Sequence, residues 1–246
     1  MRNLVVTIKF DGRAFHGWQV QKNAPTVMQA FQDALEKVIK SRPDVKGCSR
    51  TDSGVSAKMY CLSFKTNCAI PCEKLILALN INLPKEIAAI GCREESEDFH
   101  ARYSSKGKKY CYRILNSQVR DPFLEGFVLH CPFPKEIDAD FLNKQAQHFV
   151  GRHDFKSFQN SGTVMEDTVR TVYSCEVIRH GDLIEFYVSG DGFLYNMVRI
   201  MAGTLLDIAK GNILPDTIPE IIAACDRKRA GITAPAQGLI LEEVFY

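Results

Sequence analysis

The chain has 246 residues, of which 46% are hydrophobic and 24% are charged, and its 31 basic and 29 acidic residues leave a net charge of +2. These values exclude disordered and collagen-like proteins, and the length fits one large domain or two small ones. So weak a net charge does not by itself indicate a nucleic-acid-binding protein. Lys9 and Asp11 interrupt the first apolar run, and no later run approaches the roughly 18 residues of a membrane helix, so we expect a cytoplasmic protein without a membrane segment.

The first half of the chain alternates strand-like and helix-like patterns. Apolar residues recur at helical spacing after Thr26, and a second helical segment ends before Pro84. In chain order we predict a strand at 4–10, a helix at 27–39, a strand at 60–65, a helix at 73–80 and a strand at 87–93.

The second half repeats this alternation without a residue-level repeat. We predict a strand at 109–115, a helix at 138–150, a hairpin of two strands around 180–182, helices at 194–210 and 218–225, and a strand at 239–246. The whole pattern predicts an α+β protein of two similar α/β halves, 1–104 and 105–246, with largely antiparallel strands.

The nine cysteines are an odd number and are scattered without the spacing of a disulfide framework. Cys68 and Cys72 form the closest pair, but three residues separate them and no second pair matches them. We therefore expect reduced thiols and no metal site.

One stretch, residues 99–120, combines basic and aromatic side chains and contains no acidic residue. Its members include Arg102, Lys106, Lys108, Lys109, Arg113 and Arg120, with Phe99, Tyr103, Tyr110 and Tyr112 among them. Cations for phosphates and flat rings for bases are what a site for single-stranded RNA needs. The alternative is a solvated strand edge protected by lysines.

Three further segments are candidates for chemistry. Residues 47–57 are mostly small and place Arg50 two positions before Asp52, which could act as nucleophile or base or could simply stabilise a turn. Residues 189–199 end a strand in glycines and start a helix that carries Arg199, which could equally cap a surface. His153 and Asp154 are adjacent on an expected loop, and adjacent residues rarely form an acid/base pair.

Seven motifs in order along nearly the whole chain resemble the TruA family of tRNA pseudouridine synthases. They are Asp11-Gly12 with Phe15-His16-Gly17-Trp18-Gln19, Thr26-Val27-Met28-Gln29, Arg50-Thr51-Asp52-Ser53-Gly54-Val55, Phe99-His100-Ala101-Arg102, Lys109-Tyr110-Cys111-Tyr112-Arg113, His153-Asp154-Phe155 and Gly192-Phe193-Leu194-Tyr195-Asn196-Met197-Val198-Arg199, with Gly238-Leu239-Ile240-Leu241 near the end.

The resemblance implies a role for each candidate residue. Asp52 is the nucleophilic aspartate, Arg50 helps to open the RNA and fill the place of the flipped nucleotide, and Arg199 pairs with the catalytic carboxylate. Tyr110 stacks on the substrate base and Leu241 contacts it. With the basic stretch, Arg102, Lys106 and Lys108 become candidate RNA contacts.

The resemblance also implies the activity and the assembly. Family members are homodimers that isomerise uridines 38, 39 and 40 of tRNA without cofactor or metal, and their two halves share one extended central sheet with helices outside. Ser49, Ser53 and Ser56 stand where the family usually has Gly, Ala and His. These departures leave open a relative that modifies other uridines or another RNA, and a non-catalytic RNA-binding protein is the alternative from a different class.

Overall fold

The computed structural model describes residues 1–133, 136–160, 162 and 167–246, and the chain divides into two units. Unit 1 comprises Met1–Lys106 and Ile240–Tyr246, and unit 2 comprises Gly107–Leu239. The boundary at 106/107 lies two residues beyond the one we expected. The final strand, which we expected in the second half, belongs to unit 1 from Ile240 onward, because it pairs with a strand of that unit.

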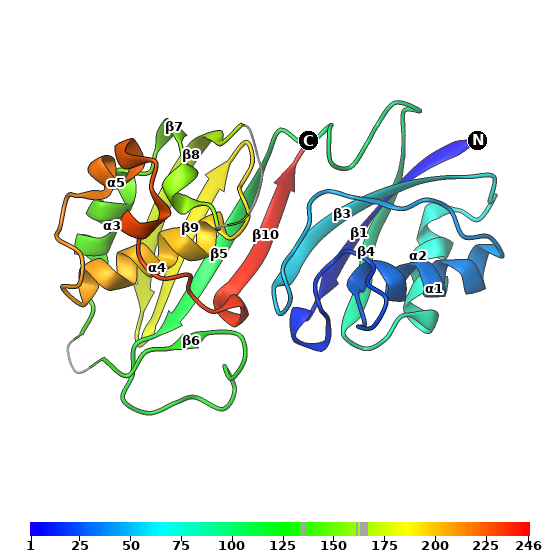
Figure 1. Ribbon diagram of the computed structural model, residues 1–246. Coiled ribbons are helices and arrows are strands. Elements are labelled where there is room, and N and C mark those ends of the chain that lie inside the picture. Colours follow the sequence, from blue (N-terminus) through cyan, green and yellow to red (C-terminus); the bar gives the residue numbers. More distant parts are fainter. Residues whose placement is uncertain (134–135, 161, 163–166) are drawn as a thin grey trace. The chain divides into compact units, whose positions relative to one another are not determined.

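Unit 1 is a sheet with helices packed on it (Figure 1). Its strands are β1 (Arg2–Phe10), β2 (Lys46–Gly47), β3 (Ser56–Thr66), β4 (Ile87–Glu95) and β10 (Leu239–Phe245), and its helices are α1 (Val27–Ile39), α2 (Cys72–Asn82) and the short 3-10 helix η1 (Gly12–Ala14). The order is β4-β1-β3-β10, with β2 also paired to β3. Only the β3–β10 pairing is parallel among those described in this unit.

Helix α1 has the start and the buried face that the sequence pattern predicts. Its start is fixed by Thr26, whose hydroxyl accepts a hydrogen bond from the Gln29 amide at 3.4 Å. Its end is fixed by Lys40 in the left-handed conformation, with φ of 57°. Phe31 lies on the buried face, 6.4 Å from the ring of Phe64 on β3, so the apolar stripe packs on the sheet as its spacing predicts.

Unit 2 has the same layered organisation. Its strands are β5 (Gly107–Leu115), β6 (Leu129–His130), β7 (Gly151–Asp154), β8 (Val169–His180) and β9 (Leu183–Gly190); its helices are α3 (Ala139–Gln147), α4 (Met197–Ala209) and α5 (Ile218–Ala224), with 3-10 turns η2 (Lys156–Phe158), η3 (Arg227–Arg229) and η4 (Ala236–Gly238). The order is β5-β9-β8-β7, all antiparallel, and β6 runs parallel to β5. The predicted hairpin turns at Gly181, whose φ is +58°.

The structure confirms the predicted α+β class and the largely antiparallel pairing. Besides the place of β10, it differs from the sequence-based prediction at β7, at two helix ends, and at β3, which begins at Ser56 rather than at residue 60. Residues 151–154, which we expected as a loop, form β7 because they pair with β8. These residues are mostly polar and do not alternate with apolar ones, so the sequence pattern gives no strand signal. Helix α3 ends at Gln147 rather than 150 because Gly151, with φ of +120°, starts β7. Helix α4 starts at Met197 rather than 194 because Asn196 adopts φ of 62°.

The helices of the described ranges are all too short or too polar to cross a bilayer. The nine cysteines are free thiols. The expectation that the two halves share one extended sheet stays a prediction.

Candidate active site

Asp52 lies on a tight turn between β2 and β3 in unit 1. The turn is closed by backbone atoms, since the Val55 amide donates to the Asp52 carbonyl at 3.2 Å, and Gly54 adopts φ of +81°. The Asp52 side chain is partly exposed and that of its neighbour Arg50 is exposed. The backbone therefore fixes the position of a carboxylate that remains accessible.

The segment that follows β1 holds this turn in place. The Trp18 amide donates to the Thr51 carbonyl at 3.2 Å, and the Gly54 amide donates to the Phe15 carbonyl at 3.3 Å. Gly17 has φ of +84°, and a Cβ there would lie 2.5 Å from the Thr51 carbonyl oxygen. Only glycine fits such an approach of two backbones, which explains why the motif at 15–19 accompanies the motif at 50–55.

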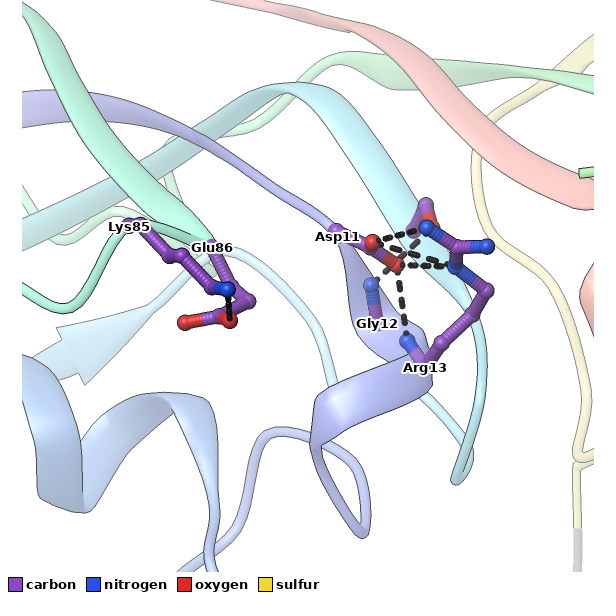
Figure 2. Close-up of polar contacts among 6 residues, drawn as sticks. Asp11, Gly12, Arg13, Lys85 and Glu86 are labelled. Atoms are coloured by element: carbon purple, nitrogen blue, oxygen red, sulfur yellow. Dashed lines mark hydrogen bonds and ion pairs between the residues drawn. The ribbon is translucent and has the colours of Figure 1, made fainter. Parts of the chain in front are cut away.

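Gly12 approaches the other end of the turn. A Cβ on Gly12 would lie 2.0 Å from the Val55 carbonyl oxygen, and the Gly12 amide donates to the Ser56 hydroxyl at 3.0 Å. Asp11 starts η1 by accepting a hydrogen bond from the Arg13 amide at 3.0 Å and by binding the Arg13 guanidinium at 2.6 Å (Figure 2). The hydrogen bond from the Arg13 side chain lowers the pKa of Asp11.

The serines that depart from the family pattern have different surroundings. Ser56 accepts the bond from Gly12, and the Ser53 hydroxyl donates to the Phe15 carbonyl at 3.4 Å. Both therefore help to fix the Asp52 turn. By contrast, the buried hydroxyls of Ser49 and Thr51 have no hydrogen-bond partner among the described residues.

Replacing the Thr51 hydroxyl by a methyl group should not destabilise the protein. Because a buried unpaired hydroxyl costs about 1 to 3 kcal/mol, we expect Thr51→Val to raise the free energy of unfolding by about 1 kcal/mol. The matched control is Thr26→Val, which removes the cap of α1 and should lower stability by about 1 kcal/mol. Urea denaturation of both variants measures this difference, and a Thr51→Val protein as unstable as Thr26→Val would show that the Thr51 hydroxyl is paired.

Leu241 lies beside the strand that follows the turn. It is on β10, opposite Ala57 of β3, and its side chain is fully buried. The parallel β3–β10 pairing thus brings Leu241 into the same unit as Arg50 and Asp52, although about 190 residues separate them in the sequence.

Tyr110 is fixed within unit 2. It lies on β5 opposite Val188 of β9, and its ring meets that of Phe193 at 5.2 Å and 84°, an edge-to-face arrangement. Its residue surface is only 7% exposed. Phe193 belongs to the glycine-rich segment before α4. A residue of the motif at 192–199 therefore supports the ring of Tyr110 in the motif at 109–113.

Arg199 lies in the first turn of α4, in the same unit. Its Nε donates to the Ala234 carbonyl and its Nη1 to the Asn196 side-chain oxygen, both at 2.7 Å. The positive charge of Arg199 acts on Tyr112, whose pKa burial raises and Arg199 partly lowers. The guanidinium is therefore held at two nitrogens by neutral groups.

The basic candidates differ in accessibility. Arg102 and Lys106 are exposed, whereas Lys108 is 8% exposed. Arg102 and Lys106 are therefore better placed than Lys108 for contact with RNA from solvent.

The His153–Asp154 pair has local structural partners. A ring nitrogen of His153 lies 3.1 Å from the Val150 carbonyl oxygen, and Asp154 accepts a hydrogen bond from the Thr168 hydroxyl at 2.5 Å. That bond lowers the pKa of Asp154. Within the described ranges no group of three or more His, Cys, Asp or Glu side chains could hold a metal ion.

The residues that support the candidate site in either unit were not assigned from the sequence. Gly12 and Gly17 lie close to the backbone of the Asp52 turn, and Phe193 packs against Tyr110. The sequence identified all three as members of motifs but gave them no role. The sequence signal that could have identified these residues was a glycine next to apolar residues at the end of a strand. The contact partners lie 34 to 83 positions away, so spacing could not reveal them.

Comparison with known proteins connects these motifs to one family. A family model described as tRNA pseudouridine synthase matches residues 6–104 and 145–246, which include Asp52, Arg199 and Leu241 but not Tyr110. The chain is 45% identical to tRNA pseudouridine synthase A 2 of Clostridium perfringens and 42% identical to tRNA pseudouridine synthase A of Thermoanaerobacter sp., each over 246 residues and 100% of both chains.

A solved structure titled "Crystal Structure of a Cbf5-Nop10-Gar1 Complex" overlaps with a TM-score of 0.39 at 10% identity, over 96% of this chain and 57% of that one, which is too weak to support an argument. The full-length identities and the family match show the family of this chain without that structure. The chain belongs to the tRNA pseudouridine synthase family.

Proposed function

We propose that this protein converts uridine to pseudouridine in tRNA, at positions 38, 39 and 40 of the anticodon stem-loop, with Asp52 as the catalytic carboxylate. The observation that carries the proposal is an accessible Asp52 on a backbone-fixed turn, in a chain that matches tRNA pseudouridine synthases over its full length. The product is an isomer of the substrate, so the reaction balances without atoms or electrons supplied by a cofactor.

The bonds to be exchanged define what the residues must do. The C1′–N1 bond breaks, the uracil turns, C5 bonds to C1′, the proton leaves C5 for solvent, and N1 takes up a proton. A carboxylate can assist by attacking C1′ or C6 or by removing the C2′ proton. All three routes need Asp52 ionised and close to the reacting nucleotide.

Four further residues have roles in the proposal. Arg199 stabilises the charged form of the catalytic carboxylate, since an opposite charge favours ionisation. Tyr110 stacks on the flipped base, which offsets part of the cost of about a few kcal/mol for unstacking it. Arg50 takes the place of the flipped nucleotide, and Leu241 contacts the base. We also propose, from the same family resemblance, that the protein acts in the cytoplasm as a homodimer.

Tyr110 should tolerate phenylalanine better than alanine. Phenylalanine keeps the ring face and its contact with Phe193, whereas alanine removes about 1 to 3 kcal/mol of stacking on the base. We expect kcat/KM to rank Tyr, then Phe, then Ala, with a loss of about 5- to 150-fold for Tyr110→Ala. Because Tyr110 is buried, melting temperatures must accompany the kinetics. Equal activity of the Tyr and Ala proteins would remove Tyr110 from the site.

Tritium release tests the proposed reaction. In tRNA transcribed with [5-³H]uridine, each isomerisation frees one tritium from C5 into water. We expect release with the protein and none with buffer. Binding of tRNA without release would favour the alternative, a non-catalytic RNA-binding protein.

A further inference from the structure

The turn at residues 100–104 in unit 1 has an unusually well-bonded backbone. The His100 amide donates to the Ser104 hydroxyl at 3.0 Å, and the Ser104 amide donates back to the His100 carbonyl at 2.9 Å. The imidazole Nδ1 of His100 accepts from the Arg102 amide at 3.1 Å. These bonds close the turn on itself, so its conformation does not depend on a ligand.

The same turn is anchored to the sheet of unit 1. The Ala101 amide donates to the Ser63 hydroxyl of β3 at 3.1 Å, and its carbonyl accepts from the Tyr246 hydroxyl at 2.7 Å. The Asn3 amide group of β1 donates to the Phe99 carbonyl at 2.9 Å. Burial raises the pKa of Tyr246, so that hydroxyl keeps its proton for the bond. The turn therefore has a rigid base.

On this rigid turn the ring of Tyr103 points outward, 77% exposed. The imidazole of His100 lies 4.4 Å from it at 36°, and the Arg102 guanidinium carbon lies 5.8 Å from the ring centre. Tyr110 and Tyr112, the other tyrosines of the basic stretch, are 7% and 0% exposed. Tyr103 is thus the most exposed of these three tyrosines, and the His100 ring and the Arg102 guanidinium lie beside it.

Arg102 lies over the Tyr103 ring, and Lys46 carries a second positive charge near His100. Arg102 is exposed, and Lys46 on β2 is close enough to His100 for its charge to add to the effect of burial in lowering the pKa of that imidazole. Asp44 pairs with Lys46 at 2.5 Å, and the exposed Glu97 and Asp98 precede the turn in the chain. Lys46 also pairs in the sheet with Ser63, which anchors the turn, and it precedes Asp52 by six residues.

We propose that the turn at 100–104 is a second RNA contact, in which a base other than the reacting uridine stacks on Tyr103 while Arg102 and Lys46 meet the adjoining phosphates. This rests on the proposed function only in taking RNA as the substrate. An exposed aromatic ring beside cations, on a preformed base, is the arrangement that binds unpaired nucleotides without reading their sequence. Isolated exposed aromatic residues are common, but this one lies beside His100 and Arg102 on a turn that is anchored to two strands.

The test compares tRNA binding of Tyr103→Ala and Tyr103→Trp with a matched control. Phe123→Ala is the control, because Phe123 is 93% exposed, lies in unit 2 and follows Asp121, whose carboxylate accepts from its amide at 2.8 Å. All variants carry Asp52→Asn so that the tRNA is not converted during filter binding at low salt. We expect Tyr103→Ala to raise Kd about 5- to 150-fold, and Tyr103→Trp and Phe123→Ala to stay within about twofold of the parent.

Each other result overturns the proposal. An unchanged Kd for Tyr103→Ala, an equal loss in Tyr103→Trp, or an equal loss in Phe123→Ala would each show that no base stacks specifically on Tyr103. A change in sedimentation of Tyr103→Ala with unchanged Kd would assign the ring to a contact between copies. Tritium release by the unmutated protein is scored separately, so the isomerase can stand while Tyr103 fails, and the RNA contact can stand if no tritium is released.

Discussion

Asp52→Asn is expected to abolish pseudouridine formation while the protein stays folded and still binds tRNA. Asparagine has nearly the shape of aspartate but cannot act as a carboxylate nucleophile or base, so turnover should fall by about 10³-fold or more. The fold should persist, because the turn bond from the Val55 amide goes to the backbone carbonyl of residue 52, which asparagine retains. Tritium release, tRNA binding and thermal melting together measure this.

Asp52→Ala is the control for the asparagine variant. An asparagine followed by Ser53 can deamidate and restore a carboxylate in a small fraction of molecules, whereas alanine cannot. Residual activity in the Asn protein alone would therefore report deamidation. Parent-like turnover in both variants would return Asp52 to the role of a turn residue and contradict the proposed mechanism.

Gly12→Ala is expected to cause the largest loss of stability among the substitutions considered. The new Cβ would lie 2.0 Å from the Val55 carbonyl oxygen and 2.3 Å from its carbon, and backbone atoms cannot move aside as a flexible side chain can. We expect the free energy of unfolding to fall by about 3 kcal/mol or more. Because Val55 closes the Asp52 turn, the folded fraction should also lose activity.

Gly91→Ala is the matched control. Gly91 also lies in unit 1, on β4, but a Cβ there would meet the Thr7 side chain at 3.7 Å, an ordinary van der Waals distance. Urea midpoints of the two variants should differ clearly, with Gly91→Ala within about 1 kcal/mol of the parent. Equal stability of the two variants would show that η1 and the Asp52 turn are not in contact at Gly12.

The predictable part of the fold was the part set by local patterns. Helix α1 matched its predicted bounds because Thr26 and the apolar spacing are both local signals. Strand β7 was missed because its polar residues become a strand only by pairing with β8. The place of β10 was missed because the Ile240–Ser56 pairing is a long-range contact that no spacing reports.

In the candidate site too, local motifs could be identified from the sequence, whereas the contacts that depend on the tertiary fold could not. Asp52 and Arg199 were predicted as site residues because their motifs resemble a family, and the structure adds the glycines that contact the Asp52 turn and the carbonyl group that binds Arg199. The sequence places Tyr103 and Tyr112 together among the aromatic residues of one basic stretch. Tyr112 is buried on β5, whereas Tyr103 precedes that strand on an exposed turn. The exposure of a side chain depends on the tertiary fold and cannot be derived from the composition of the segment.

Mapping pseudouridines in unmodified total tRNA tests the central claim most directly. The tRNA is incubated with the protein or with its Asp52→Asn variant, labelled with a carbodiimide that remains on pseudouridine, and read by primer extension. The account predicts new stops one nucleotide to the 3′ side of positions 38, 39 and 40 with the unmutated protein and none with the variant. Stops at other positions would contradict the proposed target, and the absence of new stops, or identical stops with the variant, would contradict Asp52-dependent isomerisation.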